Sequence, residues 1–265
     1  MLLPFMDQAA AAEKFDWNGT SPGFTGEATG QTYLEEANRV PAFSLCPSFP
    51  TFGDQPNREG YSNYVGISGA VDIPSFKEER IGSWTQGPSP TLVSGGGLMP
   101  ANFSSRIKDA RDGMSNTILL GEMGGLSKLP DGTKIVIHGT GASKFGDQDV
   151  PGWMVGCATS ASLGQRPMKL LPGKQIPLNP DGETDLQMYN ITTIRHGIGK
   201  GPFDPTQYPG YAMDGGGNNP LISSHNAGAH VLVGDGSVRF VAENVNLDTL
   251  KYLATRDDHQ SVGEY

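Results

Sequence analysis

The sequence predicts an α+β fold, with a mostly antiparallel sheet, long Gly/Pro-rich loops and a short helix at each end. The 265 residues include 37 glycines and 20 prolines, more than a fifth of the chain, which favours many short strands joined by turns over a helical bundle. Runs of about four to eight β-branched or aromatic residues are bounded by these turn residues, as strands are. No linker or internal repeat divides the chain, so we expect one globular domain over residues 1–265.

The N-terminal half is expected to begin with a helix and to contain two strands separated by a long loop. Residues 1–16 carry an apolar, alanine-rich pattern that is typical of a short amphipathic helix. Residues 61–73, YSNYVGISGAVDI, have the β-branched and aromatic content of a strand. Residues 74–105 are rich in Gly, Ser and Pro, and we interpret them as a long surface excursion. After an Asp-Gly turn, Thr117–Leu120 is predicted to form a buried strand.

The C-terminal half is expected to contain further strands and to end in a helix. Lys134–His138 follows a second Asp-Gly turn, and residues 186–197 form another predicted strand before the loop 199–220. The segment AHVLVGDGSVRFVAE alternates apolar and other residues on both sides of an Asp-Gly pair, which is the pattern of a β-hairpin. Asn246 is suited to cap a short C-terminal helix. Residues 221–258 are therefore predicted to form a hairpin-plus-helix block.

The spacing of His225, Asp235 and Gly236 indicates the two ends of a strand rather than a catalytic pair. A strand spanning the ten positions between His225 and Asp235 would hold them about 25–33 Å apart, at roughly 3.3 Å per residue. At that distance the two side chains cannot share a proton or a metal ion. We expect His225 to fix the start of the strand by hydrogen bonding, and Asp235-Gly236 to make the turn. Only a fold-back within HNAGA, residues 225–229, would bring them together.

The acidic composition argues against nucleic acids and membranes as partners. The formal net charge is −9, the isoelectric point is near 5.0, and lysine and arginine form no basic run. We therefore expect no nucleic-acid partner and no attraction to an anionic membrane surface. No stretch of about 18 apolar residues is present, so we expect no membrane span in this chain, and we see no secretory signal peptide before the fold.

The two cysteines, Cys46 and Cys157, lack the spacing of a metal site. An even number of cysteines in a Gly- and Asn-rich chain of low charge suits an exported protein with one disulfide between them. The alternative is a pair of buried free thiols.

Calcium is the one cofactor that the sequence brings into consideration. Asp181, Glu183 and Asp185 occupy every second position of NPDGETDLQ and could supply oxygen ligands on a flexible loop. The EF-hand pattern fails, because Leu186 stands where its glycine should be. A solvated acidic loop is the alternative interpretation.

The histidines indicate neither a zinc site nor an active site. None of them shows zinc-ligand spacing. His225 and His230 are five positions apart, which on a strand places them on opposite faces. A nucleophile elbow and a phosphate loop are both absent from the sequence. A hydrolase would need a cleft in which His225 or His230 meets a carboxylate within hydrogen-bond reach, and we expect no catalytic residues.

Five segments resemble those of one family, in the same order. They are LLPFMDQAAAAEKFDW, VPAFSLCPSFP, NYVGISGA, IKDARDGMSNTILLGEM and SSHNAGAHVLVGDGSVRFVAENVNLDTLKYLATRDD. Together they resemble the prepilin-type processing-associated proteins, pilin-like surface proteins of planctomycete-type bacteria with a C-terminal signature of His, nine residues and Asp-Gly. The resemblance implies a pilin-like globular domain related to type IV pilins or type II secretion pseudopilins. The apolar N-terminal helix of such proteins is missing from this sequence.

The resemblance implies a function in packing rather than in catalysis. We expect a non-enzymatic structural or interaction protein, exported to the periplasm, cell surface or medium, whose partners are other pilin-like subunits or envelope proteins. In this interpretation Asn116 and Glu122 hold the edges of the SNT…GE strand. The alternative is a secreted, calcium-dependent carbohydrate-binding module that uses acidic loops and the tryptophans Trp17, Trp84 and Trp153 against a surface polysaccharide.

Overall fold

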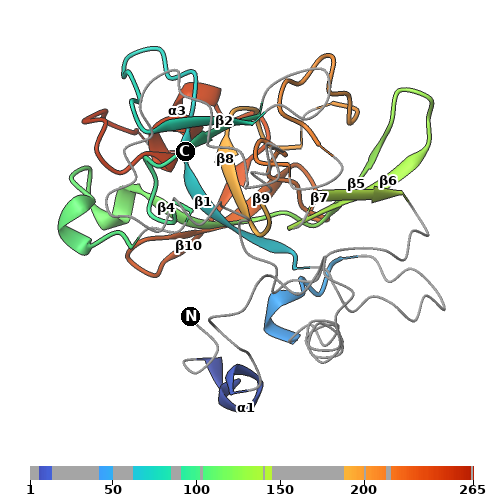
Figure 1. Ribbon diagram of the computed structural model, residues 1–265, viewed down its shortest axis with the longest axis horizontal. Coiled ribbons are helices and arrows are strands. Elements are labelled where there is room, and N and C mark those ends of the chain that lie inside the picture. Colours follow the sequence, from blue (N-terminus) through green and yellow to red (C-terminus); the bar gives the residue numbers. More distant parts are fainter. Residues whose placement is uncertain are drawn as a thin grey trace, which may run out of the picture.

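The structure, a computed structural model, describes residues 6–13, 42–49, 62–84, 91–101, 104–139, 141–144, 188–199, 201–212, 216–263 and 265. The fold is α+β with a mostly antiparallel sheet, as the sequence predicts (Figure 1). In chain order the elements are α1 (Ala9–Ala12), the 3₁₀ turn η2 (Ala42–Ser44), β1 (Tyr64–Ala70), β2 (Ile81–Trp84), β3 (Thr91–Ser94), the 3₁₀ turns η4 (Ile107–Asp109) and η5 (Met114–Asn116), β4 (Ile118–Glu122), β5 (Gly125–Lys128), β6 (Lys134–His138), β7 (Gly141–Lys144), β8 (Ile191–Ile194), β9 (Gly228–Val233), β10 (Val238–Ala242) and α3 (Leu247–Ala254). None of the helices that the structure describes has the length and apolarity needed to cross a lipid bilayer.

A five-stranded sheet forms the centre of the molecule, with the strand order β10-β9-β4-β1-β8. Neighbouring strands pair antiparallel except for β1 and β8, which are parallel. β1 is buried at every position after its first residue. Because β4 lies between β1 and β9, the sheet joins the early part of the chain to its C-terminal hairpin.

Two smaller sheets flank the central one. β2 pairs with β3, and β5, β6 and β7 form a three-stranded antiparallel sheet. The ribbon of β5 and β6 extends away from the central sheet at the right of Figure 1. β6 has the sequence KIVIH and is buried after its first residue, so this small sheet still contributes to the core.

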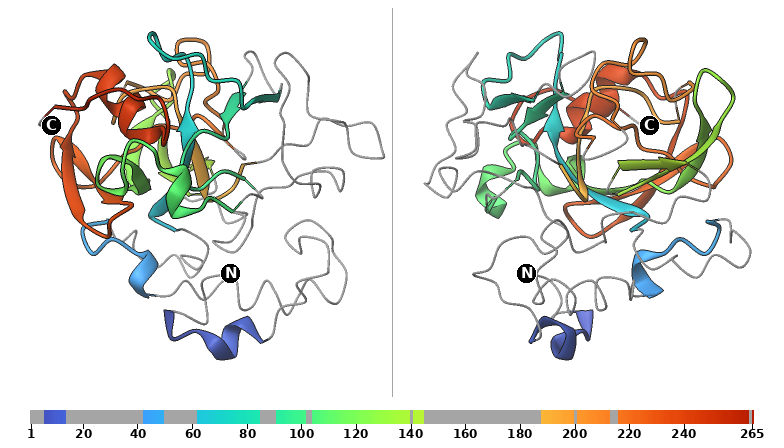
Figure 2. Two further views of the ribbon diagram at one scale, coloured as in Figure 1. Left: turned by 90° about the vertical axis from the view of Figure 1, so that its left-hand side faces the viewer. Right: turned by 45° about the vertical axis from the view of Figure 1, so that its right-hand side comes forward.

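The C-terminal helix α3 packs against the central sheet (Figure 2). It begins after Asn246, whose side chain accepts hydrogen bonds from the backbone N–H groups of Asp248 at 2.8 Å and Thr249 at 3.4 Å. This is the N-cap that the sequence predicts. Leu250 and Leu253 are completely buried in the core. Burial of such a side chain contributes about 1.5–3 kcal/mol each, so packing rather than helix propensity holds this short helix.

A row of side chains crosses four strands of the central sheet, on the face opposite to the one that packs against the core containing Leu250 and Leu253. Tyr64 of β1 is opposite Glu122 of β4, and His230 of β9 is opposite Phe240 of β10. The pairing of β4 with β9 brings Glu122 beside His230, whose backbone N–H donates to the carboxylate. Since successive residues of a strand alternate between faces, this row lies opposite the buried Val231. We call this side of the sheet the outer face.

The prediction of a surface excursion over residues 74–105 was wrong for the stretch around Gly95–Gly97. That loop follows the β2–β3 hairpin and is mostly buried. The backbone N–H of Gly97 donates to the carbonyl of Ser68 in β1 at 2.7 Å, and the Arg256 guanidinium donates to the carbonyls of Gly95 and Gly97. Glycines, which lack a Cβ, allow this close approach of two backbones. The glycines that we interpreted as marks of an exposed loop instead allow this loop to pack closely against β1.

Part of the predicted loop 199–220 is buried for a different reason. Residues 216–220 are buried, and the side chain of Asn218 exchanges two hydrogen bonds of 2.8 Å with the backbone of Leu92 in β3. The amide side chain therefore acts as a strand partner for β3. Polar loops with such side-chain bonds can lie inside a protein because their backbone groups are satisfied.

A pH dependence of stability is expected from His138 at the end of β6, which is buried. Burial lowers the pKa of its imidazole from 6.5 to about 3. Between these values the unfolded chain binds a proton that the folded chain does not, so this stability is complete above the unfolded pKa and is lost as the pH falls. In urea titrations from about pH 7 down to pH 4, we expect the His138→Gln variant to show a shallower loss of stability, by up to about 1.4 kcal/mol per pH unit.

The comparison of the two proteins isolates His138 from other titrating groups. Burial raises the pKa of Asp258 to about 7, which gives a slope of the opposite sign. Asp258 is present in both proteins, so its contribution cancels in their difference. A difference between native chain and variant that does not change with pH would show that His138 is not the titrating group.

Candidate functional site

A pocket of about 400 Å³ opens on the outer face of the central sheet. Segment 42–49 forms one wall, and it lies beside the β9–β10 hairpin in both views of Figure 2. Aliphatic side chains of β4, β9 and β10 form much of the rest, so the pocket is mainly apolar. At one end stand four polar side chains, which we call the polar cluster: Cys46, Glu122, His225 and His230.

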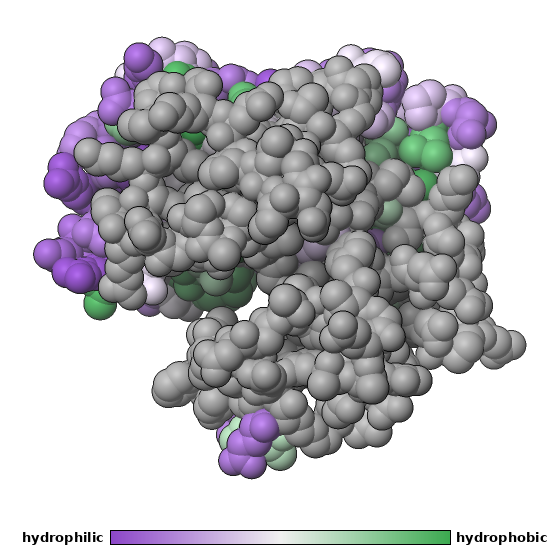
Figure 3. Space-filling model, viewed as in Figure 1, coloured by the Kyte–Doolittle hydropathy of each residue, from purple (hydrophilic) through white to green (hydrophobic). Residues whose placement is uncertain are grey.

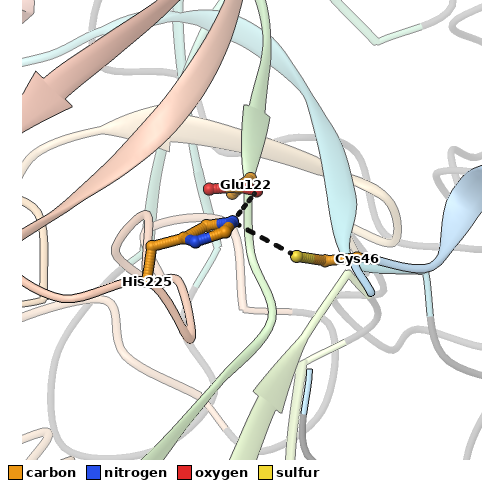
Figure 4. A group of neighbouring side chains, drawn as sticks. All are labelled: Cys46, Glu122 and His225. Atoms are coloured by element: carbon orange, nitrogen blue, oxygen red, sulfur yellow. Dashed lines mark hydrogen bonds and ion pairs between the residues drawn. The ribbon is translucent and has the colours of Figure 1, made fainter. Parts of the chain in front are cut away.

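His225 lies at the centre of the polar cluster. Its Nε2 is 3.5 Å from Sγ of Cys46 and 3.5 Å from Oε1 of Glu122 (Figure 4). The other carboxylate oxygen of Glu122 accepts a hydrogen bond of 2.7 Å from the backbone N–H of His230 and lies 3.4 Å from Nδ1 of the same residue. The two imidazole rings meet edge to face, with centroids 4.8 Å apart. The cluster is therefore a continuous set of contacts between three distant chain segments.

The segment that carries Cys46 is tied to the beginning of β1 by the buried Asn63. The backbone N–H of Cys46 donates to Oδ1 of Asn63 at 2.8 Å, and the backbone N–H of Asn63 donates to the carbonyl of Ser44 at 2.9 Å. The carbonyl of Asn63 in turn accepts from Met123, the residue after β4. One side chain and its backbone thus fix the thiol next to the end of β4.

The segment that carries His225 is tied to the same strand end. The backbone N–H of Ile222 donates to the carbonyl of Glu122 at 3.1 Å, and the hydroxyl of Ser224 donates to the carbonyl of Gly124 at 3.2 Å. The chain then turns at Ala227, whose φ is +64°, and begins β9. These bonds hold the imidazole over β4 before the hairpin starts.

The pocket end concentrates acidic groups, and the basic side chains in contact with Glu122 are the two histidines. The Glu122 side chain is 3% exposed, and no lysine or arginine among the described residues forms an ion pair with it. Burial raises the pKa of the neighbouring Tyr64, and the proximity of Cys46 and Glu122 adds to the rise. A buried carboxylate normally pairs with a cation or a metal ion, so this end of the pocket favours a positively charged group.

The structure keeps His225 and Asp235 apart, at opposite ends of β9. Asp235 and Gly236 are exposed in the turn between β9 and β10, where Gly236 has a φ of +89°. The backbone N–H and hydroxyl of Ser237 donate to Asp235 at 2.9 and 2.7 Å, which lowers the pKa of that carboxyl. The hairpin has the predicted turn, but the His225 side chain reaches the polar cluster as well as marking the start of the strand.

The prediction that His225 and His230 point to opposite faces was wrong. Their rings are in contact, because the turn at Ala227 interrupts the extended backbone between them. Counting alternation from one histidine to the other assumed a continuous strand, and β9 begins only at Gly228.

The other predicted site residues are distributed as follows. Cys46 is a free, buried thiol, and Cys157 lies outside the described residues, so their pairing stays a prediction. The calcium-ligand candidates Asp181, Glu183 and Asp185 also lie outside them, as do Trp17 and Trp153. Asn116 is exposed and donates to the carbonyl of Asp112 at 3.0 Å, next to the strand as expected, whereas Glu122 belongs to the polar cluster.

Both histidines of the polar cluster contact a carboxylate at the pocket end. The two histidine–Glu122 distances are 3.5 and 3.4 Å. These contacts are longer than the roughly 2.6–3.2 Å of a hydrogen bond that transfers a proton, a contact that often tightens only when substrate is bound. The carboxylate in contact with the histidines is also Glu122, a residue to which the sequence assigned a strand-edge role.

Sequence reasoning therefore missed the meeting of Cys46, Glu122 and His225. A signal was present, because each residue belongs to a different one of the five segments that carry the family resemblance: VPAFSLCPSFP, IKDARDGMSNTILLGEM and the C-terminal block. Residues that mark separate motifs of one family are candidates for a shared site. The sequence places them 76 and 103 positions apart (122 − 46 and 225 − 122), so no local pattern connects them.

The fold and the site define an α+β protein with an apolar pocket that ends in a partly buried Cys/Glu/His cluster. Residues 1–248 match the model of a family described as "Protein of unknown function (DUF1559)", and the chain belongs to this family. Comparisons with curated proteins and with solved structures gave no match.

Proposed function

We propose that the chain is a non-enzymatic structural or interaction protein, the globular domain of a type IV pilin-like or type II secretion pseudopilin-like protein of the cell envelope. The five ordered segments that resemble the prepilin-type processing-associated proteins support this assignment. Such a protein would be exported, and its partners would be other pilin-like subunits or envelope proteins. Its work would be the packing of copies against one another.

The observation that carries the proposal is the exposed apolar edge of the central sheet. β10 is the edge strand, and no other strand among the described residues pairs with its free side. On its outer face Val238 is 66% exposed and Phe240 is 43% exposed. An edge strand with exposed apolar side chains favours association with another chain.

The charged residue of this edge does not shield it. Proteins often protect an edge strand with a charge that points into solvent. The Arg239 guanidinium instead donates to the Tyr265 hydroxyl at 2.8 Å and lies 5.5 Å from the centre of that ring. On the face shown in Figure 3, the described residues at the left edge are mostly hydrophilic, and hydrophobic ones are visible near the β5–β6 ribbon. The exposed side chains of Val238 and Phe240 are therefore the apolar surface that this edge offers to another subunit.

A photo-crosslinking side chain at Val238 tests the packing of copies. In cells that make the protein, we expect irradiation to yield a ladder of multiples of the 28.1 kDa chain in the envelope or surface fraction. The Val238→Asp variant is expected to abolish that ladder in a chain that carries the crosslinker elsewhere on β10. Its thermal unfolding should change little, since exposed positions contribute within about 0.5 kcal/mol.

The matched control carries the crosslinker at Ile107, which is 77% exposed and lies away from the central sheet, in η4. It should give fewer chain-to-chain products or none. Monomers alone from the Val238 position, or equal ladders from both positions, would rule out the proposed packing edge.

The calcium-dependent carbohydrate-binding alternative stays a prediction, because its acidic loop lies outside the described residues. A polysaccharide array probed with and without calcium separates the two functions. Calcium-dependent retention by one glycan class, together with absence of the ladder, would favour the alternative.

A further inference from the structure

We infer that Cys46, Glu122 and His225 form a binding site for a zinc-type divalent metal ion, with one coordination position open toward the pocket. The inference concerns the polar cluster and does not depend on the packing function proposed for β10. It assigns a role to the three residues that the fold brings together from separate motifs.

Two of the three distances within the cluster are close to those of a tetrahedral metal site. The three ligand atoms lie within 4.8 Å of one another, and Nε2 of His225 is 3.5 Å from both Sγ of Cys46 and Oε1 of Glu122. Zinc with bonds of about 2.3 Å to sulfur and about 2.05 Å to nitrogen and oxygen would separate S from N by about 3.6 Å and N from O by about 3.3 Å. Such an ion would also hold sulfur and oxygen about 3.6 Å apart, within the 4.8 Å that bounds the three ligand atoms, so it fits if the Cys46 and Glu122 side chains close on it.

The same contacts do not suit a proton relay. In a relay one ring nitrogen faces the nucleophile and the other faces the carboxylate. Here a single nitrogen, Nε2 of His225, faces both Cys46 and Glu122 (Figure 4). The thiol and the carboxylate are thus both in contact with the one ring nitrogen that could bind an ion with them.

The charge balance of the cluster also favours a cation. The Glu122 carboxylate is buried, and among the described residues its ionic contacts are to the two histidines. A buried charge is stable when it is paired or bound to metal. A divalent ion would balance this carboxylate and the thiolate of Cys46, with the His225 imidazole neutral. Binding would release the thiol proton to solvent.

The ligand types select the metal. Thiolate and imidazole favour zinc and its neighbours in the transition series, whereas calcium and magnesium favour oxygen ligands. Three protein ligands leave a fourth tetrahedral position, and His225 is 32% exposed on the pocket side. Zinc sites with three protein ligands hold water or another small donor in that position.

Second contacts fix the ligands before any ion binds. His230 holds the free oxygen of Glu122 through its backbone N–H at 2.7 Å, and Asn63 holds the backbone of Cys46 at 2.8 Å. Such outer contacts orient ligands and raise affinity. The site also makes a disulfide between Cys46 and Cys157 incompatible with metal binding, because one sulfur cannot do both.

The test is metal binding by the full chain, freed of metal with a chelator and kept reduced. We expect one Zn²⁺ per chain by elemental analysis after desalting, no retention of Ca²⁺, and a rise in the unfolding temperature on adding Zn²⁺. With Co²⁺ as the probe, we expect visible bands of a tetrahedral complex and a near-ultraviolet sulfur-to-cobalt band. The cobalt spectra need no variant, so they decide even where a substitution prevents folding.

Variants then assign the ligands. Loss of an outer contact to a metal site costs about 10–100-fold in affinity, so Cys46→Ser, Glu122→Gln and His225→Gln should each weaken Zn²⁺ binding by about 100-fold or more. Cys46→Ser should also remove the sulfur-to-cobalt band. The controls are Cys157→Ser and His259→Gln, a histidine 66% exposed outside the cluster, and both should bind as the native chain does.

Three results would overturn the inference. They are a chain that takes up less than stoichiometric Zn²⁺ and shows no cobalt complex, ligand variants that bind like the controls, and a native protein whose Cys46 thiol is already oxidised to Cys157. Stoichiometric Cu²⁺ or Ni²⁺ binding with loss in the same three variants, but no Zn²⁺ binding, would reject zinc as the metal.

Discussion

The Gly97→Ala variant is expected to lower the free energy of unfolding by about 3 kcal/mol or more, the upper range for overpacking in a core. A Cβ at Gly97 would lie 2.6 Å from the backbone nitrogen of Gly69 and 2.6 Å from the carbonyl oxygen of Ile67. Both atoms belong to the buried strand β1, which cannot move without disturbing its pairs with β4 and β8. Chemical denaturation monitored by circular dichroism measures the change.

Gly263→Ala provides the matched control, because a Cβ at Gly263 meets no atom within 4 Å. Its free energy of unfolding should stay within about 0.5 kcal/mol of the native value. Equal stability of the two variants would mean that the loop around Gly97 does not pack on β1 in solution.

The Arg256→Met variant is expected to lose about 3 kcal/mol, the second large effect. The Arg256 side chain donates to the carbonyls of Gly95 and Gly97, and its backbone N–H donates to the carbonyl of Gly96 at 3.0 Å. Methionine preserves the apolar stem but leaves two buried carbonyls without their charged donor, and each such bond is worth about 1.5–3 kcal/mol. Thermal and urea unfolding should both report the loss.

Arg111→Met separates this effect from a general loss of charge, since Arg111 is exposed. We expect its stability to stay within about 0.5 kcal/mol of native. Burial lowers the pKa of Arg256, and the nearby Arg80 adds to that shift, so the site already disfavours the charge. A stable Arg256→Met variant would show that the cost of burying the cation outweighs its two hydrogen bonds.

Local patterns in the sequence predict local structure well here. The Asp235-Gly236 turn, the alternation on both sides of it and the Asn246 cap each act within a few residues. Such features depend on backbone conformations that only certain residues adopt, so they can be read from a short segment. The α+β class follows from these strand and turn patterns together with the helical patterns near both ends of the sequence.

Contacts between distant segments could not be predicted in the same way. Nothing local reveals that β4 separates β1 from β9, yet this order places Glu122 between Tyr64 and His230. The loop at Gly95–Gly97 was misjudged for a related reason. Its composition is equally suited to solvent and to close backbone packing, and only the partner strand decides between them.

The contact of Cys46 with His225 closes a chain of 179 positions, with Glu122 in between. Contacts of such long range form late, because the entropy of closing the loop must be overcome before they stabilise anything. On a chain that is still folding, the thiol therefore stays accessible to oxidants until the C-terminal hairpin docks beside β4. The time at which the Cys46 thiol loses its reactivity toward oxidants would then report when folding is complete.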